Sequence, residues 1–227
     1  MTKIVTIHQP NYIPWAGFYS KVKKADTYVI LDTVEYTKNS VINRNRIRIK
    51  DGECYLTIPI EKKYHSARIM DVCLPQDTKW KSNHWATIEC NYSKAEFFQE
   101  HAAKFKKFYE KDYEFLWQIN TEIADYEMEC FGIHPEIVKA SELDLDPALR
   151  KTDLLIEILK KTGAEKYLSG PSGRNYLEEE KFASAGIELE YFEYKHPEYK
   201  QRYPGFVPNL SAIDLLFNVG EKSKEFI

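Results

Sequence analysis

The chain has 227 residues, a formal net charge of −3 and 43% hydrophobic residues. This length predicts one domain with a buried core, and the ordinary mixture of apolar and charged residues excludes a disordered or collagen-like chain. The slightly acidic balance argues against duplex nucleic acid as a partner. The sequence has no apolar run of about 20 residues and no recognisable signal peptide, so we expect no membrane span and a cytoplasmic location.

The first 31 residues predict a strand, a helix and a second strand. An apolar strand is expected at 3–7, a helix from about 15 to 24, and another apolar strand at 27–31. Pro10 and Pro14 exclude a helix between the first strand and the start of the helix. A βαβ unit of this length predicts two parallel strands.

The middle of the chain changes character twice. Residues 41–50 and 53–60 alternate in polarity around Asp51-Gly52, which predicts a β-hairpin with a two-residue turn. Residues 69–74 are expected to add another strand. From about 80 to 131 the apolar residues recur at helical spacing, which predicts a helical insertion whose aromatic residues form a core.

The last third returns to alternating helices and strands, expected at 152–162, 166–168, 176–185 and 187–192. Ser211 and Asp214 predict a capping box that opens a final helix, with Gly220 beyond its end. Together these elements predict an α/β fold, a Rossmann-like parallel sheet with a β-hairpin excursion and a helical insertion. We expect residues 1–227 to form a single domain.

The first candidate site follows the first strand. Ligands of open α/β sheets bind beyond the carboxyl ends of strands, where a histidine can act as a general base or bind phosphate. His8 is therefore the candidate base, with Gln9, Asn11, Tyr12 and Trp15 beside it in the sequence. The alternative is a rigid turn in which His8 caps backbone groups.

The second candidate site is residues 36–50, which contain five basic residues and no acid. On a strand, Arg44, Arg46, Arg48 and Lys50 would share one exposed face, since residues two apart point the same way. Guanidinium groups match phosphate geometry, so this face predicts phosphate recognition. Arg44 and Arg46 are the preferred binders, and the alternative is a solvated face paired with acids.

Further polar side chains that could contact a substrate are Lys38, Asn45, Ser169, Gly170, Ser172, Tyr176, His196, Tyr199 and Gln201. The segment 169–174 can offer backbone N–H groups to an anion, although a tight β–α turn explains its glycines equally well. The segment 194–201 suits a substrate wall, with a surface loop as the alternative. The widely spaced cysteines predict free core thiols and no metal site.

Taken together, the sequence resembles the WbqC-like family. The matching pieces are IHQPNYIPWAGF, KADTYVILDTVEYTK, NRNRIR, YLTIPI, YLSGPSGRNYL, HPEYKQ and FVPNLSAIDLLFNVG, in that order along nearly the whole chain. The start also looks distantly like HIGH-type nucleotidylyltransferases, but Pro14-Trp15-Ala16-Gly17 stands where their second histidine would be.

The resemblance implies a role in bacterial surface-polysaccharide biosynthesis, including O-antigen pathways. It implies an N-acyl or aminoacyl (glycyl-type) transferase that uses an acyl or aminoacyl donor and a nucleotide-linked amino sugar, with no other cofactor assigned. In this hypothesis His8 is the base, Asn11 or Tyr12 orients substrate, and Arg44 and Arg46 hold a diphosphate. Ser169, Gly170 and Ser172 contact a second anion or the donor. The alternatives are a nucleotidyltransferase-like enzyme and a non-catalytic sugar-nucleotide binding protein. The sequence leaves the oligomeric state open.

Overall fold

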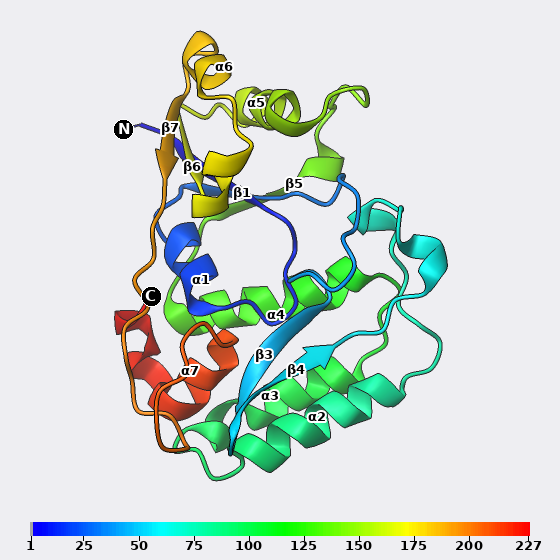
Figure 1. The fold of residues 1–227 in the computed structure, drawn as a ribbon, viewed down its shortest axis with the longest axis vertical. Coiled ribbons are helices and arrows are strands. Elements are labelled where there is room, and N and C mark those ends of the chain that lie inside the picture. The colour runs from blue at the N-terminus through cyan, green and yellow to red at the C-terminus, as the bar shows by residue number, and fades with distance from the viewer. Residues whose placement is uncertain (1) are drawn as a thin grey trace. The chain divides into compact units, whose positions relative to one another are not determined.

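The computed structural model describes residues 2–227, which gather into two compact units (Figure 1). The first unit combines residues 2–9, 20–33 and 134–195, and the second combines 10–19, 34–133 and 196–227. Each unit is therefore built from stretches that are far apart in the sequence. That the chain forms a single domain stays a prediction.

The first unit contains a five-stranded parallel sheet, which confirms the predicted α/β class. Its strands, in spatial order, are β5 (Glu136–Lys139), β2 (Thr27–Ile30), β1 (Ile4–His8), β6 (Lys166–Ser169) and β7 (Glu188–Tyr191). Val5 in β1 pairs with Thr27 on one side and Tyr167 on the other. The central strands β1, β2 and β6 are largely buried, which fits their apolar sequences.

Two helices of this unit, α5 (Lys151–Lys161) and α6 (Glu179–Ser184), supply apolar side chains to its core. The rings of Tyr167 and Phe182 stack with centroids 5.7 Å apart. Edge strand β5 is not among the predicted elements, because its four residues, EIVK, show no clear alternation of polar and apolar side chains. The helix expected at 176–185 is shorter, since a 3-10 turn occupies Pro171–Asn175 and α6 begins at Glu179.

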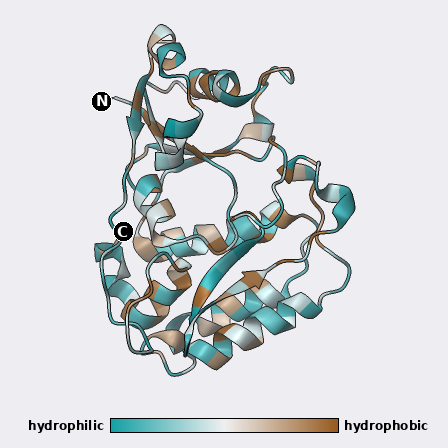
Figure 2. Ribbon diagram, viewed as in Figure 1, coloured by the Kyte–Doolittle hydropathy of each residue, from teal (hydrophilic) through white to brown (hydrophobic). Residues whose placement is uncertain are grey.

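The second unit contains the predicted hairpin and helices. The hairpin is β3 (Arg44–Ile49) with β4 (Gly52–Thr57), and the helices are α2 (Lys79–Tyr92), α3 (Phe98–Glu110), α4 (Leu116–Phe131) and α7 (Ala212–Val219). The predicted aromatic core is present, because the rings of Phe98 and Phe105 lie 5.1 and 5.3 Å from that of Phe217. Figure 2 shows β3 as mostly hydrophilic, unlike the apolar strand β1.

Helix α1 (Ala16–Val22) follows the predicted loop after β1. The remaining 3-10 helices are Lys62–Tyr64, Ile69–Asp71, Ala140–Glu142 and Gly220–Glu225. The expected strand at 69–74 is therefore wrong, because a 3-10 turn occupies its first half and only an isolated bridge joins Cys73 to Phe115. The hairpin turn is shifted by one residue, since Ile49 pairs with Gly52 and leaves Lys50 and Asp51 at the tip.

No helix among residues 2–227 is long and apolar enough to cross a membrane. The four cysteines are unpaired thiols. Their expected position in the core is wrong: Cys90 is exposed on α2, and Cys54, Cys73 and Cys130 are only partly buried.

Candidate functional site

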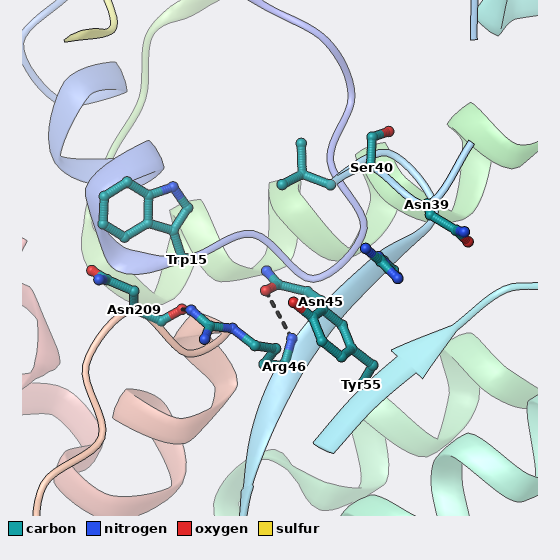
Figure 3. A pocket seen from close by; sticks show the side chains of 9 residues that line it. Trp15, Asn39, Ser40, Asn45, Arg46, Tyr55 and Asn209 are labelled. Atoms are coloured by element: carbon teal, nitrogen blue, oxygen red, sulfur yellow. Dashed lines mark hydrogen bonds between the residues drawn. The ribbon is translucent and has the colours of Figure 1, made fainter. Parts of the chain in front are cut away.

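A pocket of about 580 Å³ lies in the second unit (Figure 3). It is lined by Trp15, Asn39, Ser40, Val41, Arg44, Asn45, Arg46, Tyr55 and Asn209. Three separate segments and both strands of the hairpin contribute to it. The lining side chains include two guanidinium groups and two aromatic rings, and none of the nine is a carboxylate. This composition favours an anionic ligand that also carries a planar or apolar group.

The two arginines on β3 differ in what they contact. The Arg46 guanidinium pairs with Glu53 across 2.6 Å and donates to the Asn209 carbonyl oxygen over 3.2 Å. The Arg44 guanidinium lies 4.6 Å from the centre of the Tyr55 ring. No acid within residues 2–227 forms an ion pair with Arg44. Arg44 is therefore the cation of this pocket whose charge is available to a ligand.

Asn45 fixes the floor of the pocket. Its side-chain amide donates to the Ile13 carbonyl over 2.7 Å, and its carbonyl accepts from the Arg46 backbone N–H over 2.8 Å (Figure 3). Ile13 has a φ of +39°, which is unusual for a β-branched residue. Asn120 supports the same loop by donating to the Pro10 carbonyl over 3.0 Å. Such strain persists only where surrounding contacts hold it, and it is typical of functional loops.

Two further asparagines of the pocket lie in left-handed backbone conformations. Asn39 has a φ of +56° and Asn209 a φ of +59°, and both are exposed. Asparagine tolerates this conformation better than other residues with a Cβ atom. The Trp15 indole lies against the first turn of α1 because Gly17 has no side chain: a Cβ atom there would overlap the indole ring.

Arg48 is not part of the pocket, so the prediction of one exposed cationic face is wrong at this position. Its side chain is buried and donates to the carbonyl oxygens of Gly52 and Pro204, each over 2.7 Å. These bonds stabilise the hairpin turn. The two backbone oxygens also compensate the buried positive charge of Arg48. Lys50 is exposed at the hairpin tip, beyond the end of β3.

Beneath β3, Asp214 holds several elements of the second unit together. The carboxylate is fully buried and accepts hydrogen bonds from the Tyr92 hydroxyl, the Tyr199 hydroxyl and the Gln201 amide over 2.7–2.9 Å. Burial raises the pKa of Asp214, and these bonds oppose that increase. The predicted capping box is therefore wrong: Asp214 faces the core, and the Ser211 side chain makes no capping bond.

The predicted residues at 196–201 gather around this carboxylate. The rings of His196 and Tyr199 stack with their centroids 6.0 Å apart. The Gln201 side-chain amide donates to the Val207 carbonyl oxygen and accepts from the Val207 backbone N–H. They shape the loop that leads to Asn209 and do not line the pocket. Their contact with a substrate stays a prediction, as does that of the exposed Lys38.

Asn11 and Tyr12 are buried beside the pocket-forming loop. The Tyr12 hydroxyl bonds His84 Nδ1 over 2.8 Å and the Tyr109 hydroxyl over 2.7 Å. Burial lowers the pKa of His84 to about 4, so this histidine is neutral at pH 7. The cluster anchors the loop on α2 and α3, and a role for Tyr12 in orienting substrate stays a prediction.

The first unit carries the other predicted residues at the carboxyl edge of its sheet. His8 ends β1 and Ser169 ends β6, which are neighbouring strands. From β1 the chain continues to β2 on one side, and from β6 to β7 on the other, so the strand order reverses between them. Such a switch point is where open α/β sheets bind ligands. Gly170, Ser172 and the exposed Tyr176 follow β6, and Gln9 follows β1.

His8 is neutral in the folded protein. Burial, together with the positive charge of Lys21, lowers the pKa of His8 to about 3. His8 Nδ1 lies 2.9 Å from the Gln9 carbonyl oxygen. Because a carbonyl only accepts, the proton of the neutral ring is on Nδ1 and the lone pair is on Nε2. Nε2 is then the atom that could accept a proton, although a pKa of about 3 makes it a weak base at pH 7.

Sequence reasoning did not select Asn39, Ser40, Val41, Tyr55 or Asn209 as site residues. Tyr55 could have been found from the hairpin, because it lies directly opposite Arg46. The shifted turn hid this pairing. Asn209 lies in a loop far away in the sequence. Apart from its place in the FVPNLS segment, nothing in the sequence indicates it as a site residue.

Residues 9–226 match the WbqC-like protein family. A relative from Mycobacterium tuberculosis (strain ATCC 25618 / H37Rv), "Uncharacterized protein Rv1507c", is 34% identical over 227 residues, which cover 99% of this chain and 97% of the relative. No solved structure matches the chain. Since the match extends over nearly the whole sequence, the resemblance is confirmed, and the chain belongs to the WbqC-like protein family.

Proposed function

We propose that this protein transfers an acyl or aminoacyl group to the amine of a nucleotide-linked amino sugar, in the biosynthesis of a surface polysaccharide. The observation that carries the proposal is the pocket of the second unit, which combines arginines with aromatic rings and amides. A nucleoside diphosphate sugar has the matching parts: two negative phosphates, a planar base and a polar sugar.

Arg44 and Arg46 bind the diphosphate in this proposal. Charge-assisted bonds from guanidinium groups to phosphate are short and directional, and each contributes about 1.5–3 kcal/mol. Tyr55 is 53% exposed and offers one ring face for stacking, while the Arg44 guanidinium lies over the ring. Stacking of a base on such a ring contributes about 1–3 kcal/mol. The amides of Asn39, Asn45 and Asn209 offer donors and acceptors to sugar hydroxyls.

The transfer step forms a bond between the sugar amine nitrogen and the acyl carbon. The bond from that carbon to its leaving group breaks, and the leaving group departs with the electron pair. The attacking amine must lose a proton, and His8 Nε2 is the proposed acceptor. A positioned general base contributes about 10²–10⁴-fold to such a step.

Binding can be tested before any donor is known. We expect a nucleoside diphosphate amino sugar to raise the thermal midpoint in proportion to its occupancy, since a ligand stabilises the folded state by mass action. Arg44→Ala should weaken this binding, whereas Lys62→Ala removes an exposed charge from a 3-10 turn elsewhere in the second unit and should leave it unchanged. Equal binding to wild-type protein and Arg44→Ala would remove the pocket from the proposal.

A further inference from the structure

Glu53 is an acid that pairs with one of the arginines of the pocket. Its Oε1 atom lies 2.6 Å from Nη1 of Arg46, and the side chains of Glu53 and Arg46 are 32% and 29% exposed. Glu53 does not itself line the pocket, and none of the nine lining residues is an acid. The ion pair therefore brings a negative charge to a site whose lining side chains are otherwise cationic or uncharged.

The hairpin directs the Glu53 carboxylate to Arg46. The strand register places Glu53 directly opposite Arg48, with Arg46 on the diagonal. The Arg48 guanidinium is buried and donates to the carbonyl oxygens of Gly52 and Pro204, so it does not pair with the carboxylate. Long side chains on one face of an antiparallel pair reach their diagonal neighbours, which is how Glu53 meets Arg46.

Arg46 keeps donors for a ligand in spite of this pair. Its Nη1 group donates to Glu53, and its Nη2 group donates to the Asn209 carbonyl oxygen over 3.2 Å. In Figure 3 the Arg46 side chain extends from β3 toward Asn209. A guanidinium has more N–H groups than these bonds use, so a ligand phosphate can bond Arg46 while Glu53 stays in place. The phosphate then meets a cation whose charge is already partly neutralised.

Glu53 lowers the net charge that the pocket offers to a ligand. Arg44 has no ion pair with an acid in the described part of the chain, and its guanidinium lies 4.6 Å from the centre of the Tyr55 ring. Arg44 and Arg46 are positive and Glu53 is negative, so these three side chains leave a single net positive charge. A ligand with more negative charge than the arginines can offset is repelled by Glu53.

Two forms of the same nucleotide differ in this respect. In a nucleoside diphosphate sugar, the sugar esterifies the terminal phosphate, and each phosphate carries one negative charge. In the free nucleoside diphosphate, the terminal phosphate has a second ionisation with a pKa of about 6, so it carries most of a further charge at neutral pH. The charge beside Arg46 can therefore distinguish the two forms.

We propose that Glu53 is a specificity-determining residue, which makes the pocket favour the nucleoside diphosphate sugar over the free nucleoside diphosphate. Its carboxylate opposes the additional charge of a free terminal phosphate and leaves Arg44 and Arg46 enough charge for the esterified one. Water screens a pair that is exposed to this extent, so the discrimination is severalfold. The inference rests on the proposed function, because it names the form of nucleotide that the same pocket takes.

The test is calorimetric titration without divalent cations, which would neutralise the terminal phosphate. The probes are the diphosphates of uridine, deoxythymidine and guanosine, each compared with its hexose conjugate and with the methyl ester of its terminal phosphate. The methyl ester has the charge of the conjugate but no sugar. We expect Glu53→Gln to strengthen the free diphosphate at least about threefold more than the conjugate or the methyl ester.

A matched variant separates this effect from a change in net charge. Glu110→Gln also removes one exposed acid from an ion pair, because Glu110 ends α3 and lies 3.6 Å from Lys106. It should leave the ratio of the affinities as in wild type. The thermal midpoint of Glu53→Gln should stay close to that of wild type, since an ion pair of this exposure contributes little to stability.

Three results would overturn the inference and leave nucleotide binding by the pocket intact. One is the same ratio of affinities in Glu53→Gln and wild type. Another is an equal weakening of every probe by Glu53→Gln, which would make Glu53 a residue that positions Arg46. The third is a methyl ester that responds as the free diphosphate does. If wild type binds none of the probes, the proposed function fails at the pocket and this inference fails with it.

Discussion

The Tyr92 hydroxyl donates to Asp214 Oδ1 over 2.8 Å and accepts a hydrogen bond from the Arg48 backbone N–H over 2.8 Å. One buried carboxylate is thereby linked, through one tyrosine, to the strand that carries the pocket arginines. The same carboxylate holds Gln201, which bonds Val207 in the loop before Asn209. The two sides of the pocket therefore depend on a single buried acceptor.

We predict that Asp214→Asn destabilises the protein by about 2–4 kcal/mol, because an amide cannot accept from all three donors and leaves buried polar groups unpaired. Tyr92→Phe removes a smaller part of the network and should cost about 1–2 kcal/mol. Urea denaturation measures both. Equal stability of Asp214→Asn and wild type would show that the network does not support the fold.

Arg44 and Arg46 should separate binding from stability. Arg44→Ala should leave the thermal midpoint nearly unchanged and weaken a nucleoside diphosphate sugar by about 1.5–3 kcal/mol. Arg46→Ala should weaken the ligand and also lower the midpoint slightly, since its ion pair with Glu53 is lost. Calorimetric titration with each variant measures the affinities. Unchanged affinity in both would identify β3 as a solvated surface.

Much of this architecture could be predicted from the sequence. The βαβ start, the hairpin and the helical insertion follow from local periodicity, because each is formed by residues close together in the chain. The buried position of Arg48 could not be predicted. Alternation places it on the same face as Arg46, and one of the carbonyl oxygens that it contacts belongs to Pro204, which is far away in the sequence. The sequence predicts a helix cap at Asp214 for a similar reason: its true partners, Tyr92 and Gln201, come from α2 and a loop.

The residues of the site also differ in how far the sequence predicts them. The sequence indicates Arg44, Arg46 and Trp15 as site residues by their types and spacing, whereas Asn209 joins the pocket through tertiary structure alone. The sequence does not single out Lys21, because a lysine near the end of a short helix is ordinary. Its burial without a counter-ion is visible only in the folded chain.

Lys21 should make stability depend on pH. Its pKa is about 7 in the folded protein and near 10.5 when unfolded, so the unfolded chain binds more protons between these values and stability rises with pH. In buffers without carboxylate or phosphate, Lys21→Met should exceed wild type by about 2–4 kcal/mol at pH 6. The difference should shrink toward pH 10, as measured by denaturant unfolding. A difference that is constant with pH would contradict an unpaired buried ammonium.

His8 should remain neutral down to mildly acidic pH. With a folded pKa of about 3 against an ordinary 6.5, the unfolded chain takes up the proton first, so stability falls as pH falls from about 6.5 toward 3. NMR titration of the histidine ring protons measures this directly. Lys21→Met should raise the pKa of His8, because it removes the second cause of the lowering. A His8 signal that titrates near 6.5 in wild type would contradict the buried environment.

The central claim is that the amine of a nucleotide-linked sugar is acylated. Its most direct test is mass spectrometry of a nucleoside diphosphate amino sugar after incubation with acetyl and glycyl thioesters, with the corresponding sugar that carries a hydroxyl as the control substrate. We predict that the amino sugar gains the mass of one acyl group, that the hydroxyl sugar does not, and that EDTA leaves turnover largely intact. His8→Asn should lower kcat by about 10²–10⁴ without preventing sugar-nucleotide binding. Release of pyrophosphate with a strict Mg²⁺ requirement, or tight binding of the amino sugar with no mass change under any of these donors, would contradict the account.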